Sequence, residues 1–140
     1  MPGNKRMLGV AILNVLKEYS DAEHPLKRND IIALVQKHYN LHCDRKTVTD
    51  NIHGLQSMGY EIVSSRNPSG TYFAGRPFEE SELRILIDDI LFSPMISQPQ
   101  ARELIKKLIS LGGQHFREKV PHIRNLSALP HGVNQQIFYT

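Results

Sequence analysis

Residues 44–60 read DRKTVTDNIHGLQSMGY, and they decide the fold of this 140-residue chain. Asp44 is predicted to cap a helix, because its carboxylate can accept a hydrogen bond from a backbone N–H of the first turn. A stripe at helical spacing is predicted to be buried and consists of Val48, Ile52, Leu55 and the small Gly59. Gly59 is also expected to end the helix in a left-handed conformation.

The opposite side of this predicted helix is polar. At about 100° per residue, it carries Lys46, Asp50, His53 and Ser57, with Arg45 and Thr49 along its edge. Two interpretations fit such a side: a solvated face of an amphipathic helix, or a surface that hydrogen-bonds a ligand. The elements predicted before and after this helix help to decide between a solvated face and a ligand-binding surface.

Two further helices are predicted ahead of residue 44. In residues 5–19, apolar side chains recur at helical spacing: Leu8, Ala11, Ile12, Val15, Leu16 and Tyr19. The second helix is expected from about Arg28 to Tyr39, with Asn29 as its cap. Its buried positions are predicted to be Ile31, Ile32, Leu34, Val35 and Tyr39.

A β-hairpin is predicted directly after Gly59. Residues 60–65 and 71–74 are rich in β-branched and aromatic side chains, and they flank the turn-forming cluster at 66–70. Three helices followed at once by a hairpin is the order of a winged helix-turn-helix. The predicted fold class is therefore mainly α with a small β-hairpin, and residues 1–76 are expected to form a DNA-binding domain.

A second pair of helices is predicted beyond the boundary at Gly75-Arg76-Pro77. One covers residues 79–92, and the other starts near Ser97 as its cap and stops at Gly112-Gly113. Their stripes are Leu83, Leu86, Ile87, Ile90 and Leu91 in the first helix and Ala101, Leu104, Ile105, Leu108 and Ile109 in the second.

These stripes need a partner surface, which could be each other, the first domain or a second copy of the chain. Residues 77–113 are expected to form a helical hairpin used for dimerisation or as a linker. An irregular tail is expected over residues 114–140, with a helical turn at 116–120. It ends on apolar residues 137–139, as if cut at the edge of a further domain.

Charge and composition narrow the classes of protein. The net charge of +3 lies in residues 1–78, which hold ten Lys and Arg against seven Asp and Glu. This excess is compatible with a polyanion partner. No secretory signal or membrane-length apolar run is evident, and the single Cys43 fits a reducing compartment. We therefore expect a cytoplasmic protein.

The chain resembles the N-terminal part of bacterial transcriptional regulators of the WYL-domain family. The resemblance rests on Asp44-Arg45-Lys46-Thr47-Val48, on Met58-Gly59-Tyr60-Glu61-Ile62, and most specifically on residues 81–93 followed by 101–108. It implies a DNA-binding regulator that acts as a homodimer and senses a small effector only through a C-terminal WYL domain, which this sequence does not include. The chain departs from the family at Asp50, where relatives usually carry a basic residue, and at Thr49, where they often carry a basic or aromatic one.

The polar side of the third helix would then face DNA. Arg45 and Lys46 are expected to contact guanine or phosphate, Thr49 a thymine methyl group, and His53 a phosphate or base edge. Asp50 has two interpretations: it accepts a hydrogen bond from cytosine N4, or it pairs with Lys46 one turn earlier. Thr47 is expected chiefly to support the helix start.

The hairpin turn offers Arg66, Asn67 and Ser69 to the DNA backbone or minor groove, although a turn without a DNA role would look the same.

Other chemistry finds little support in the sequence. His38, His42, Cys43 and Asp44 lie close together, but their spacing matches no common zinc pattern. No nucleophile, base and orienting group can be assembled, so we expect no enzyme, no metal and no cofactor. The alternative function is a winged-helix protein-interaction module that does not bind DNA.

Overall fold

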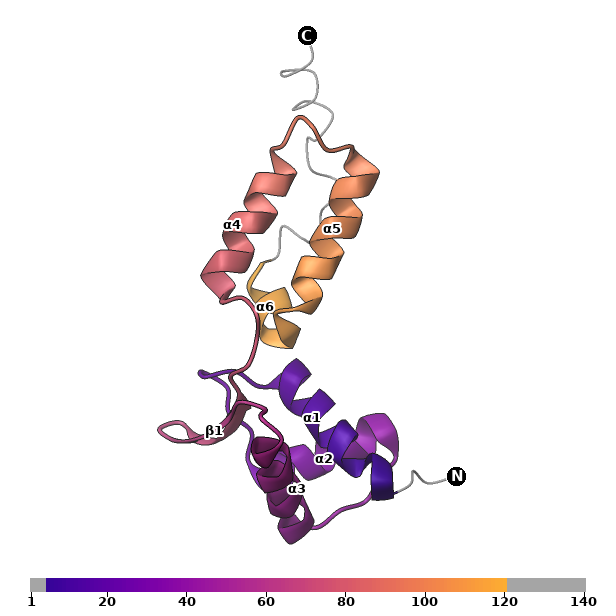
Figure 1. Ribbon diagram of the computed structural model, residues 1–140, viewed down its shortest axis with the longest axis vertical. Helices are drawn as coiled ribbons and strands as arrows, with labels where there is room; N and C mark the ends of the chain where they lie inside the picture. The colour runs from indigo at the N-terminus through magenta and orange to yellow at the C-terminus, as the bar shows by residue number, and fades with distance from the viewer. Residues whose placement is uncertain (1–4, 121–140) are drawn as a thin grey trace. The chain divides into compact units, whose positions relative to one another are not determined.

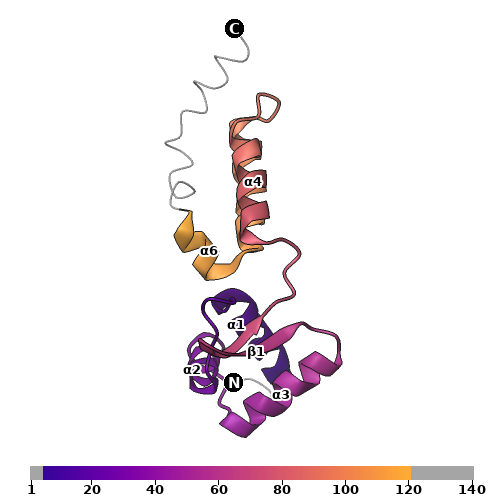
Figure 2. The same ribbon diagram turned by 90° about the vertical axis from the view of Figure 1, so that its left-hand side faces the viewer.

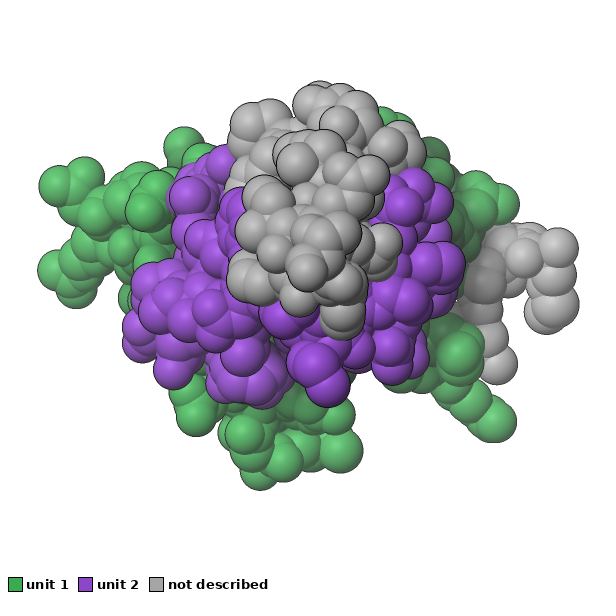
Figure 3. All heavy atoms as spheres, turned by 90° about the horizontal axis from the view of Figure 1, so that it is seen from above, with its two compact units in different colours: residues 1–75 green, residues 76–140 purple. Residues whose placement is uncertain are grey.

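The computed structural model describes residues 5–120 of the chain. The chain divides into two compact units, Met1–Gly75 (unit 1) and Arg76–Thr140 (unit 2), which Figure 3 colours separately. Three helices and a two-stranded antiparallel hairpin make up unit 1, and further helices make up unit 2. This confirms the predicted mainly helical class with its small hairpin.

Unit 1 is built on three mutually packed helices (Figure 1). A short 3-10 turn, η1 (Lys5–Met7), leads into α1 (Leu8–Tyr19), which is followed by α2 (Arg28–Tyr39) and α3 (Arg45–Ser57). Their apolar faces meet in one core, formed by Leu8, Ala11, Ile12, Leu13, Val15, Leu16, Ile31, Val35, Leu41, Val48, Ile52, Leu55, Ile62 and Phe73. The predicted stripe of Val48, Ile52 and Leu55 is therefore confirmed.

The hairpin consists of β1 (Ile62–Arg66) and β2 (Ser69–Phe73), paired in antiparallel register. Pairing continues to Arg66 and Ser69, so the turn is only Asn67-Pro68, shorter than the predicted 66–70. Buried Ser20, just after α1, joins the hairpin to the helices: its hydroxyl donates to Leu16 O (2.6 Å) and accepts from Phe73 N–H (2.9 Å). The hairpin is thus fixed to the three-helix core.

An additional bridge, which the sequence pattern did not reveal, extends this sheet. Leu26, between α1 and α2, exchanges two backbone hydrogen bonds of 2.8 Å with Thr71 of β2. Gly70 lies next to this bridge at φ +144°, and a Cβ there would come within 2.9 Å of the Leu26 carbonyl oxygen and of Pro25. Glycine at position 70 is therefore required both by its backbone angle and by this close approach.

Three details of unit 1 differ from the predictions. The cap of α2 is Lys27, whose N–H donates to the Asp30 carboxylate (2.9 Å), and Asn29 lies inside the helix. Tyr39, a predicted buried position, is 41% exposed. Gly59 is exposed and does not belong to the buried stripe, since the chain has already left α3 at that point.

Unit 2 contains α4 (Glu80–Leu91) and α5 (Gln98–Ser110), which lie side by side, and the shorter α6 (Gly113–Lys119). The predicted cap Ser97 is confirmed, since its hydroxyl accepts from Gln100 N–H (3.3 Å). The core consists of Leu83, Ile87, Leu91, Ile105, Ile109, Phe116 and Val120. Lys119 also forms an ion pair with Glu80 (3.2 Å).

Two features of unit 2 bear on the sequence-based expectations. The stripes of α4 and α5 pack on each other and on Phe116, so they do not need a second chain to be covered. The expected helical turn in the tail is a full helix that starts at Gly113, because Phe116 is completely buried. Residues 121–140, including the expected apolar end of the chain, lie outside the described residues. Within residues 5–120, the helices are too short or too polar to cross a bilayer.

Candidate nucleic-acid interface

Helix α3 begins at a well-formed cap. The Asp44 carboxylate accepts a hydrogen bond from Thr47 N–H (2.7 Å), as the sequence predicts. Hydrogen bonding from Thr47 lowers the pKa of the Asp44 carboxyl, and the nearby Lys46 ammonium lowers it further. Asp44 is therefore a charged cap at neutral pH, and Thr47 supports the helix start through its backbone.

Hydrogen bonds also fix the C-terminal end of α3. Gly59, at φ +103°, donates to Gln56 O (3.0 Å), and Tyr60 N–H donates to Leu55 O (3.1 Å), which is the Schellman arrangement. The Gln56 side chain donates to Ile62 O (2.7 Å) and so connects α3 to β1. Both ends of α3 are thus held, and the helix is a stable support for the side chains on its outer face.

The outer face of α3 is open to solvent. In Figure 2, α3 lies along one edge of unit 1. Its exposed residues include four of the predicted site residues, namely Arg45, Lys46, Asp50 and His53. Ser57 is also exposed, but its hydroxyl donates to Gly54 O (2.7 Å). The structure therefore gathers one cluster of polar side chains along the exposed length of a single helix.

Thr49 has a different environment from these four residues. Its hydroxyl donates to Arg45 O (3.0 Å) and accepts a hydrogen bond from Arg28 Nε, at the first position of α2. Thr49 is half-buried, and its hydroxyl is already engaged by Arg28 and by the Arg45 carbonyl oxygen. Arg28 is a site residue that the sequence pattern did not reveal. The adjacent basic pair Lys27-Arg28 at the start of α2 is the signal that could have identified it.

The Asp50 side chain makes no hydrogen bond or ion pair within residues 5–120. The predicted pairing with Lys46 is absent there, and Lys46 instead acts on Asp44. The Asp50 carboxylate is consequently exposed and available to an external donor. Of the two interpretations of Asp50, pairing with Lys46 is not seen, and the hydrogen bond from a cytosine of bound DNA stays a prediction.

The hairpin turn presents Arg66, Asn67 and Ser69, all of them exposed. Arg66 and Ser69 face each other as the last register pair of the hairpin. Because β2 is attached to Leu26 and Ser20, this turn has a fixed origin on unit 1. The turn therefore offers a second, smaller polar surface on the same unit as α3.

An open groove of about 500 Å³ runs along α3 on the side of α1. Its lining residues are Gly9, Asp50, Asn51, Gly54, Leu55, Ser57 and Met58. Asn51 is held in place, since its amide donates to Thr47 O (2.8 Å). The groove thus extends the exposed face of α3 by a shallow concave strip with Asp50 on its border.

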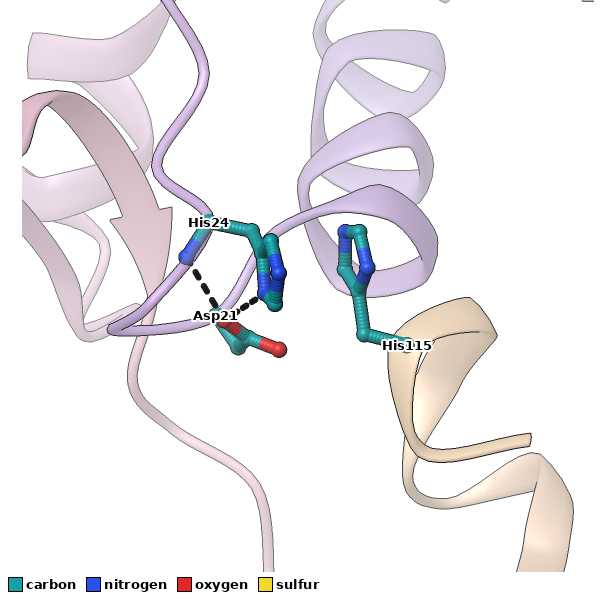
Figure 4. Close-up of side chains that lie close together, drawn as sticks. All are labelled: Asp21, His24 and His115. Carbon is teal, nitrogen blue, oxygen red and sulfur yellow. Dashed lines mark hydrogen bonds and ion pairs between the residues drawn. The ribbon is translucent and has the colours of Figure 1, made fainter. Parts of the chain in front are cut away.

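Three other groups in unit 1 are Asp21 with His24, Cys43, and His38 with Tyr19. Figure 4 shows that the Asp21 carboxylate accepts from both the backbone N–H (2.7 Å) and the ring Nδ1 (2.8 Å) of His24, which closes the turn after α1. Burial raises the pKa of the Cys43 thiol, and the negative charge of Asp44 raises it further. The thiol is therefore not activated as a nucleophile. His38 is engaged by Tyr19, whose hydroxyl lies 2.9 Å from His38 Nε2.

Comparisons with protein-family models, with curated proteins and with solved structures gave no match.

Proposed function

We propose that this chain is the DNA-binding part of a cytoplasmic, non-catalytic transcriptional regulator of the WYL type, with unit 1 as a winged helix-turn-helix. In this assignment α3 is the recognition helix and the β1–β2 hairpin is the wing. The observation that carries the proposal is the exposed face of α3, which bears Arg45, Lys46, Asp50 and His53. A helix of this kind fits the major groove of B-DNA, where its N-terminal half reaches base edges.

The distribution of positive charge on unit 1 supports this assignment of α3 and the hairpin. Arg45 and Lys46 lie in the first turn of α3, and Arg28 reaches Thr49 from α2, so three cations lie around the N-terminal half of α3. The Arg28 guanidinium has five N–H donors, of which Nε is used by Thr49. Arg66 adds a fourth cation at the tip of the hairpin. This distribution is suited to contacts with phosphates on either side of a groove.

The salt dependence of DNA affinity tests this proposal. We expect wild-type affinity for duplex DNA to fall steeply with salt. Arg28→Ala, Arg45→Ala and Lys46→Ala should each weaken binding. Each should also reduce the slope of log K against log salt, by about 0.9 for every phosphate that the variant no longer neutralises.

Lys37→Ala is the matched control for these variants, because Lys37 is an exposed cation on α2 about 13 Å along the helix axis from Arg28. It should leave the slope unchanged. If Arg28→Ala, Arg45→Ala and Lys46→Ala also keep the wild-type slope, the assignment of α3 as the recognition helix is contradicted.

A second candidate is a winged-helix protein-interaction module that does not bind DNA. The exposed apolar residues of unit 2 favour it, since Ile85, Phe92 and Met95 are 61%, 60% and 83% exposed. This alternative predicts no salt-sensitive retention of the protein on DNA, even at low ionic strength. The salt dependence of DNA affinity therefore separates the two candidate functions.

A further inference from the structure

We propose that Asp50 and Gly54 form a base-reading notch on α3, in which the Asp50 carboxylate accepts a hydrogen bond from the N4 amino group of a cytosine. This inference rests on the proposed DNA-binding function and specifies one base that the interface selects. It concerns two residues one helical turn apart that border the same groove.

The negative charge of Asp50 restricts the bases that it can face. A carboxylate on a surface that approaches phosphates is repelled by them, so it weakens binding unless it gains a donor. Asp50 has no such donor within residues 5–120. Among major-groove base edges, cytosine N4 and adenine N6 are the donors, but the N7 acceptor beside adenine N6 disfavours a carboxylate. Cytosine is therefore the base that best satisfies Asp50.

The space beside Asp50 is open because residue 54 is a glycine. Gly54 lies in the interior of α3, where glycine lowers helix stability relative to alanine. Its packing does not explain this cost, because a Cβ added at Gly54 would meet no atom within 4 Å. The missing side chain leaves the groove open next to Asp50, so a base edge can approach the carboxylate and the helix backbone closely.

Selection from a random pool of duplex DNA tests the notch, with the 140-residue chain as wild type, Asp50→Asn and Gly54→Ala. We expect the wild type to enrich cytosine at one position of its site. Asp50→Asn should move that position toward adenine, because an amide pairs with adenine N6 and N7. In binding assays, the wild-type preference for a C·G pair over a T·A pair at this position should fall by about tenfold or more in Asp50→Asn.

Gly54→Ala should weaken binding to the selected site while the variant remains folded, as judged by circular dichroism and thermal unfolding. Glu61→Gln is the matched charge control, because Glu61 is exposed and lies outside α3. It should keep the wild-type base preference.

Three results would count against the inference, and they are distinguishable. If Asp50→Asn binds all duplexes more tightly and selects the same sequence, Asp50 only repels phosphates and the base-reading role is overturned, while DNA binding stands. If Gly54→Ala binds the selected site as tightly as the wild type, the notch is overturned. If the wild type enriches no sequence and shows no salt-sensitive binding, the proposed function itself fails and the inference fails with it.

Discussion

Asp44 determines where α3 starts through a single carboxylate. It accepts the Thr47 N–H hydrogen bond, and its negative charge lies at the positive end of the helix. The hydrogen bond from Thr47, followed by the nearby Lys46 ammonium, lowers the pKa of Asp44 in the folded protein. All the proposed contact residues of α3 follow this cap, so their positions depend on it.

We predict that Asp44 makes the stability of unit 1 depend on pH. Because the folded pKa is below the ordinary value of 3.8, the carboxylate stabilises the fold above that value, and this contribution disappears as the pH falls through the lowered pKa. Thermal unfolding of the wild type and of Asp44→Asn from pH 7 to pH 2 measures the effect. The wild type should lose its advantage over the variant in acid, and a constant difference across this range would contradict the prediction.

At the scale of elements, the contrast between two glycines is informative. Gly70 adopts a positive φ and lies against Pro25 and Leu26, whereas Gly54 lies in a helix beside open space. The same substitution to alanine therefore has opposite consequences for the two elements. One glycine is required by the packing of the hairpin, and the other leaves α3 less stable than it could be.

We predict that Gly70→Ala lowers the free energy of unfolding by about 1–3 kcal/mol, because alanine is strained at this φ and its Cβ displaces the Leu26 bridge. Gly54→Ala should instead raise it by up to about 1 kcal/mol. Chemical denaturation of both variants checks the two signs. Destabilisation by Gly54→Ala would show that its neighbourhood is not open, and a neutral Gly70→Ala would show that the hairpin does not depend on this close approach.

Local patterns were sufficient to predict most elements. Helical periodicity, the Asp44 cap and the Gly59 terminus depend on residues within a few positions of one another, and the structure confirms each of them. The contacts that complete unit 1 join distant residues, and periodicity does not report them. Ser20 with Phe73, Leu26 with Thr71 and Arg28 with Thr49 all became apparent only in three dimensions.

Some features of the candidate site could also be predicted from local patterns, and others could not. Exposure of Lys46, Asp50 and His53 follows from the helical period, so it could be predicted. Whether Asp50 pairs with Lys46 could not be predicted, because helical spacing allows this pair without requiring it. The half-buried position of Thr49 also depends on α2, which lies 21 residues away in the sequence at Arg28.

At the scale of the whole molecule, self-association is a separate question from DNA binding. The inner stripes of α4 and α5 are already covered within unit 2, so they no longer argue for a dimer. Ile85 of α4 and Phe92, which caps the C-terminal end of this helix, are both largely exposed and form an outer apolar side of unit 2. This outer side is the surface through which we propose that the regulator forms a homodimer.

We predict that Ile85→Ser and Phe92→Ser each raise the dimer dissociation constant by about tenfold or more, equivalent to ~1.4 kcal/mol. Size-exclusion chromatography with light scattering over micromolar concentrations measures it. Val63→Ser is the control, since it removes an exposed apolar side chain from β1 in unit 1. A wild type that is monomeric at every concentration would contradict the proposed dimer.

The central claim, that the outer face of α3 enters a DNA groove, is tested most directly by NMR mapping of the amide shifts of the whole chain during titration with a duplex selected by the wild type. We predict the largest shifts within Arg45–Ser57, with smaller shifts at Arg28 and at Arg66, Asn67 and Ser69 of the hairpin end. Shifts confined to α4–α6, or no shifts under conditions where an unrelated DNA-binding protein saturates, would contradict the account.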